Sequence, residues 1–198
     1  MIENITLDLS KTECLKTNEV YHFSIHLCKD ELNGRKVLFT NGLHQIDQTK
    51  NAGKTTFVYP NIELYFLLPT YWDFQKNDQM WPLEMLNRIA TVLYKNETWF
   101  SPGDTIPSSR TKPPYPINDQ FLQNYFILSE PIEANSILER IQTGIQFLSI
   151  IPIFNQEFHY KNGHSAFELL EKLKEKGHTE LLDQFRLPVA KKRFFGLF

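Results

Sequence analysis

The sequence predicts a single α+β domain with a mixed, mostly antiparallel β-sheet flanked by helices. Segments with strand patterning come first, one amphipathic helix follows, and strands and then helices return. This order does not match a regular βαβ alternation. A chain of 198 residues fits one domain. We expect that domain over residues 1–190 and a basic, aromatic tail over residues 191–198.

The first predicted strand covers residues 20–29. Its alternation places Phe23 and Ile25 on one face and His22 and His26 on the other. Further strands are expected over residues 36–40, 55–68 (interrupted at Pro60), 121–128 and 144–154.

The clearest predicted helix covers residues 82–95, with Pro82 at a first-turn position where a missing N–H costs nothing. A second helix is expected over residues 165–176, where Ser165 and Glu168 form a capping box and Gly177 ends the helix. A shorter helix is expected over residues 179–185. Five of the eleven prolines fall within residues 101–116, which predicts an extended loop.

Charge and hydropathy exclude several classes of protein. The net charge is −2, so the basic excess typical of nucleic-acid binders is missing. No run reaches 18 apolar residues, and the first ten residues lack the pattern of a signal peptide. These features predict a cytoplasmic protein that binds neither nucleic acid nor a membrane.

The sequence offers no strong cofactor, metal or catalytic motif. Residues 52–56 (AGKTT) are similar to the end of a phosphate-binding loop, but Gln48 stands where that loop needs glycine. His22 and His26 share a strand face without an evident third zinc ligand. We therefore predict no cofactor, no metal and no catalytic residues. A small enzyme with a scattered site around His22, His26 or Glu157 remains the rival interpretation.

Several segments, taken in order over about residues 35–190, resemble the Suppressor of fused domain family. The matching motifs are a Thr-x-Gly-Leu turn, a Glu-Leu strand that ends in Leu-Pro near a Trp, a Trp-Pro helix, a Gly-containing loop and a Pro-Ile-x-x-x-Glu segment. The residues that carry them are Thr40, Gly42, Leu43, Glu63, Leu64, Leu68, Pro69, Trp72, Trp81, Pro82, Trp99, Gly103, Pro152, Glu157 and Gly163. His44 and Asp104 depart from the expected pattern, and both lie in loops.

Most of these motif residues are interpreted as structural. Gly42 and Gly103 supply positive φ in turns, and the three tryptophans are expected to close the core over the sheet. Glu63 and Glu157 are carboxylates in apolar strand contexts, which need a cation or backbone donors. We expect each of them to make a hydrogen bond that holds the fold.

The resemblance implies a protein-interaction domain. Short stand-alone members resemble bacterial immunity proteins, so the expected partner is another protein such as a toxin, neutralised by stoichiometric binding. A regulatory or structural subunit of a constitutive complex is the other alternative. The predicted contact surface comprises two long loops, with His44 in the first and Arg110, Lys112 and Tyr115 in the second.

Overall fold

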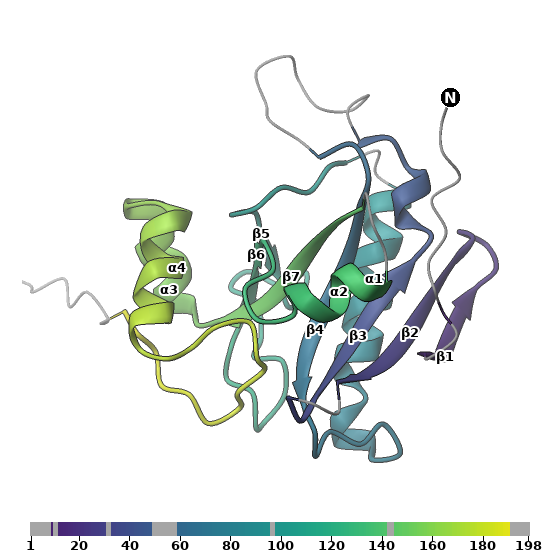
Figure 1. Cartoon of the computed structure of the whole chain (residues 1–198). Helices are drawn as coiled ribbons and strands as arrows, with labels where there is room; N and C mark the ends of the chain where they lie inside the picture. The colour runs from purple at the N-terminus through teal and green to yellow at the C-terminus, as the bar shows by residue number, and fades with distance from the viewer. Residues whose placement is uncertain are drawn as a thin grey trace, which may run out of the picture.

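A computed structural model describes residues 9, 12–30, 33–48, 59–95, 98–141 and 145–190 of the chain. Its centre is a seven-stranded sheet in the order β1-β2-β3-β4-β7-β6-β5 (Figure 1). The strands are β1 (Thr12–Asn18), β2 (Phe23–Asp30), β3 (Arg35–Asn41), β4 (Ile62–Pro69), β5 (Thr105–Pro107), β6 (Tyr125–Ser129) and β7 (Gln146–Ile153). The pair β4–β7 is parallel and the other pairs are antiparallel. The predicted mixed, mostly antiparallel α+β fold is confirmed.

Helices cover both faces of this sheet. Helix α1 (Trp81–Lys95) lies behind the sheet in Figure 1, and α2 (Asn135–Ile141) lies in front of it. Helices α3 (Asn155–Gly163) and α4 (Ala166–Glu175) lie to one side, next to the β6 and β7 strands. None of the helices in the described ranges is both long enough and apolar enough to cross a bilayer.

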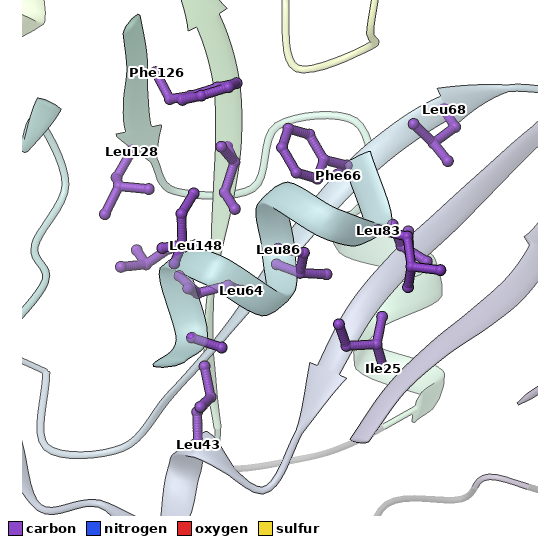
Figure 2. Close-up of a cluster of buried hydrophobic side chains, with 14 of the residues drawn as sticks. Ile25, Leu43, Leu64, Phe66, Leu68, Leu83, Leu86, Phe126, Leu128 and Leu148 are labelled. Carbon is purple, nitrogen blue, oxygen red and sulfur yellow. The ribbon is translucent and has the colours of Figure 1, made fainter. Parts of the chain in front are cut away.

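The larger core lies between α1 and the sheet (Figure 2). Leu64, Phe66 and Leu68 point from β4 toward this helix, and Leu83 and Leu86 point back from it. All five side chains are at most 6% exposed. Burying a side chain of this size contributes roughly 1.5–3 kcal/mol, so the α1 face holds much of the stability of the domain.

The opposite face carries a second core under α2. Phe39, Tyr65 and Phe147 form it together with Ile137 and Leu138 of the helix. Alternate residues of β4 therefore enter opposite cores, which explains why the strand is buried along nearly its whole length. Phe23 and Ile25 enter the α1 core while His26 stacks on Phe39, which confirms the predicted faces for these residues. His22 was expected on the same strand face as His26, but it lies in the turn before β2 with a φ of 50°.

Three predicted strands were too long at their N-terminal ends. The 20–29 strand begins only at Phe23, after a turn. In the described part of residues 55–68, the strand begins at Ile62, after Pro60. The 121–128 strand begins only at Tyr125. The side chain of Asn118 accepts the backbone N–H of Phe121 at 2.8 Å, which turns the chain before it can enter the sheet.

The predicted helix over residues 179–185 was wrong. Leu181 instead forms a parallel bridge with Leu67, and the N–H of Leu182 donates to the carbonyl of Leu67 at 2.9 Å. This extended segment satisfies its backbone by pairing with the central strand β4, and local helix propensity carries no information about so distant a partner.

Other elements were not predicted. They are β1, β5, α2 and α3. Trp99 was expected in the core and is only half-buried, while its neighbour Phe100 fills that place at 7% exposure. The AGKTT turn and the tail over residues 191–198 lie outside the described residues.

Candidate protein-binding surface

Glu63 is a fully buried carboxylate that holds the turn after β3. Its Oε1 accepts the backbone N–H groups of Gly42 at 2.8 Å and His44 at 3.1 Å, and its Oε2 accepts the Thr40 hydroxyl at 2.5 Å. Gly42 has a φ of 124°, and a Cβ there would lie 2.7 Å from the carbonyl oxygen of His22. Glu63 thus makes hydrogen bonds to this turn, and Gly42 has the positive φ that the turn requires.

His44 was predicted to contact a partner, and its ring faces the protein interior. The ring Nδ1 lies 2.6 Å from Oε1 of Glu63, and the side chain is 15% exposed. A carboxylate oxygen can only accept a hydrogen bond, so the ring nitrogen Nδ1 carries the proton and donates it. The ring thus takes part in the same hydrogen-bond network as the turn that precedes it.

Glu157 holds the start of α3 and the segment that follows α4. Arg186 donates to both of its carboxylate oxygens at 2.7 Å, and the backbone N–H groups of Phe154 and Val189 complete the set at 2.8 and 2.9 Å. These hydrogen bonds join two segments that are distant along the chain. The paired Arg186 meets the requirement for a cation beside a buried carboxylate.

Glu180 is a third buried carboxylate, which sequence analysis did not identify. It accepts the Tyr65 hydroxyl at 2.7 Å and the backbone N–H groups of Ile132, Glu133 and Ala134 just before α2. Burial and the charge of Glu180 raise the pKa of Tyr65. Its position directly before the apolar pair Leu181-Leu182 repeats the pattern of Glu63 before Leu64, and this was the available signal.

His26, one centre of the rival enzyme interpretation, is held between two hydroxyl groups. Its Nδ1 lies 3.2 Å from Thr12 Oγ1 and its Nε2 lies 2.8 Å from Ser24 Oγ. Since the Thr12 hydroxyl donates to the carbonyl of Leu9, it accepts from Nδ1–H, and Ser24 donates to Nε2. Burial lowers the pKa of His26 and favours this neutral form.

A hollow of about 380 Å³ lies at the end of the β1–β2 hairpin, and it is open to solvent. Hydroxyl and amide side chains such as Ser24, Asn41 and Gln45 line it, together with His22 and Glu19. Glu157 is not among the lining residues, so the three centres of the rival interpretation do not converge there. Within the described ranges, no group of three His, Cys, Asp or Glu side chains is arranged to hold a metal ion.

The proline-rich loop between β5 and β6 is fastened at both ends. Arg88 of α1 donates to the carbonyls of Pro107 at 2.8 Å and Ser108 at 2.5 Å. Asn124 donates to the carbonyl of Pro114 at 3.0 Å. Phe121 is 1% exposed and packs between the rings of the core tryptophans. These contacts hold the loop in one conformation without regular secondary structure.

Three of the four predicted contact residues lie on this loop. Arg110 and Lys112 are exposed, and Tyr115 is 65% exposed although its backbone N–H is held by Ser109 Oγ at 2.9 Å. We call Arg88 together with these three residues the loop surface. It combines side-chain types that are enriched at protein interfaces, an aromatic ring and arginine, on a fixed backbone.

The model of the Suppressor of fused protein (SUFU) family matches residues 19–186. The chain belongs to the Suppressor of fused family. No curated protein matches it.

Two crystal structures show the same fold. One is a Suppressor of fused homologue from Neisseria gonorrhoeae FA 1090, with 17% identity, a TM-score of 0.60, and coverage of 92% of this chain and 88% of the other. The second is a chain of the Sufu–Fu complex, with 13% identity, a TM-score of 0.55, and coverage of 92% and 86%. At identities this low, the likeness shows a shared fold alone.

Proposed function

We propose that this Suppressor of fused domain is a protein-binding module that neutralises a cognate bacterial toxin in the cytoplasm by stoichiometric binding. The observation that carries the proposal is the loop surface, where Arg110, Lys112 and Tyr115 project from a backbone fixed by Arg88 and Phe121. A fixed loop loses little conformational freedom on binding, so more of the contact energy remains as affinity. The Sufu–Fu complex shows that a relative with this fold forms a complex with another protein.

The buried polar groups support binding over catalysis. Glu63, Glu157 and Glu180 each accept several donors from the protein itself, which leaves them little capacity to act on a substrate. The neutral His26 likewise has both ring nitrogens engaged. The polar chemistry of these residues maintains the backbone around the loops.

The test begins with the tagged full chain in its own host. The protein that co-purifies is identified, and the gene for the present chain is then removed. Neutralisation is supported if the partner kills cells that lack the present chain. The partner should also form a one-to-one complex with the present chain in light scattering. A partner that stays harmless would instead favour a subunit of a constitutive complex.

A matched pair of variants tests the surface. The triple variant Arg110→Glu, Lys112→Glu, Tyr115→Ala should weaken binding of the recovered partner by roughly a hundredfold or more, as expected when interface anchors are lost. The control Lys174→Glu, Lys176→Glu, Tyr71→Ala likewise reverses two positive charges and removes one tyrosine ring, at exposed positions elsewhere, and should bind normally. Loss of binding only in the control would place the interface away from the loop.

A further inference from the structure

Arg88 carries a positive charge that its known partners do not neutralise. Both of its hydrogen-bond acceptors, the carbonyls of Pro107 and Ser108, are neutral. Two of the five N–H donors of the guanidinium meet these carbonyls, and the side chain is only half-buried. Donors and charge therefore remain available at the base of the loop.

Arg110 adds a second positive charge two residues after Ser108, whose carbonyl Arg88 contacts at 2.5 Å. Burial and the nearby charge of Arg110 both lower the pKa of Arg88. Within the described ranges, no carboxylate forms an ion pair with either arginine, and Asp119, the acidic residue of the same loop, pairs with neither. The Arg88 guanidinium nevertheless stays protonated, because arginine does not lose its proton in proteins.

Two other arginines in the described part of the chain are paired with carboxylates. Arg186 forms a two-pronged pair with Glu157 at 2.7 Å, and Arg35 pairs with Glu133. Two like charges placed together without a counter-charge repel each other, and an anion between them removes that cost. The pair Arg88–Arg110 is thus an incomplete ion-pair site on an exposed surface.

We propose that Arg88 and Arg110 together bind a carboxylate side chain of the partner, so that the loop surface recognises an acidic protein segment. The inference rests on the proposed function, since it names the chemistry of the partner at the same surface. Planar guanidinium groups match carboxylates through paired hydrogen bonds. Lys112 extends the positive charge along the loop, and Tyr115 offers an aromatic contact for an apolar neighbour of the acidic residue.

The test follows the arginine side chains of the full chain by nuclear magnetic resonance. The protein, ¹⁵N-labelled at arginine, is titrated with the capped peptide Ac-Glu-Glu-Glu-NH₂ and, separately, with Ac-Gln-Gln-Gln-NH₂. The Nε–H signals of Arg88 and Arg110 should shift and saturate with the glutamate peptide, and the glutamine peptide should leave them in place. Equal shifts with both peptides would overturn the proposal.

Variants separate this site from general attraction between charges. Arg110→Gln removes an exposed positive charge and leaves the contacts of Arg88 with the loop in place. It should weaken binding of the glutamate peptide by about tenfold, as expected for loss of a charge-assisted hydrogen bond. Lys174→Gln, at an exposed position of α4, should have no effect. If both variants weakened binding of the glutamate peptide equally, a specific site would be contradicted. Tighter binding of a thymidine oligonucleotide or inorganic phosphate than of the glutamate peptide would contradict it as well.

The outcomes distinguish this proposal from the function on which it rests. If the recovered partner binds Arg110→Gln as tightly as the parent protein, acid recognition is overturned while partner binding stands. If the arginine signals respond to the glutamate peptide but no protein co-purifies with the chain, the carboxylate site stands and neutralisation fails.

Discussion

Buried carboxylates act as hydrogen-bond hubs at the residue scale. Glu63, Glu157 and Glu180 are each at most 1% exposed, and each accepts at least two backbone N–H groups from segments without regular hydrogen-bond partners. Loops cannot satisfy these donors through a sheet ladder or a helix, so an internal acceptor replaces water. A single side chain therefore fixes the conformation of a loop.

Replacing Glu63 by Gln should destabilise the protein by about 1–3 kcal/mol. Glutamine keeps the size of the side chain but turns one acceptor oxygen into a donor that faces other donors from Thr40, Gly42 and His44. Urea unfolding measures the difference. Glu171→Gln, at an exposed position of α4, is the control and should change the free energy of unfolding by less than about 0.5 kcal/mol.

His26 should make the stability depend on pH. Burial lowers its pKa below the ordinary value, so the folded protein binds fewer protons than the unfolded chain as the pH falls through the usual histidine range. Its contribution is complete above that range and is lost on acidification from pH 7.5 to 5.

Unfolding curves across that interval check the sign. The variant His26→Gln should show a shallower fall in stability than the parent, by less than the one-proton limit of about 1.4 kcal/mol per pH unit. The exposed His159→Gln should retain the parent slope. An unchanged slope in His26→Gln would mean that another group titrates.

At the scale of elements, a few local contacts set where helices and loops begin and end. Helix α4 starts where the Ser165 hydroxyl accepts the N–H of Glu168 at 3.1 Å, and it stops before Gly177, which has a φ of 74°. The loop that contains Gly103 is packed directly against the start of this helix, since a Cβ at Gly103 would lie 2.8 Å from Cβ of Ala166.

Gly103→Ala should therefore destabilise the protein by about 1–3 kcal/mol, because alanine is strained at a φ of 89° and would also collide with α4. Gly163→Ala is the matched control, since nothing lies within 4 Å of its added Cβ and its φ is not in the positive region. That control should keep the midpoint of thermal unfolding. A loss of equal size in both variants would show that contact with α4 is not the cause.

At the scale of the whole molecule, the distribution of charge matters more than its sum. The net charge is only −2. Arg110 and Lys112 nevertheless lie on one loop beside Arg88 of α1, and none of the three has a paired acid among the described residues. A local positive surface guides an acidic partner during encounter, and dissolved salt screens this attraction.

The association rate of the recovered partner should accordingly fall by about tenfold or more between 50 and 500 mM salt. The dissociation rate should change less. Surface plasmon resonance with the immobilised full chain measures both rates. An association rate that does not respond to salt would argue that the loop surface plays no part in the encounter.

The sequence alone determined the strand faces around Phe23 and His26, the helix at α1, and the need for partners at Glu63 and Glu157. Each of these depends on local periodicity or on the chemistry of one residue, which neighbours along the chain reveal. Tertiary structure decided that residues 179–185 form an extended segment paired with Leu67, that His44 turns toward Glu63, and that Arg88 meets the loop of Arg110. These contacts join segments about 20 to 115 residues apart, and the hydrogen bonds and charges that stabilise them exist only once the sheet has brought those segments together.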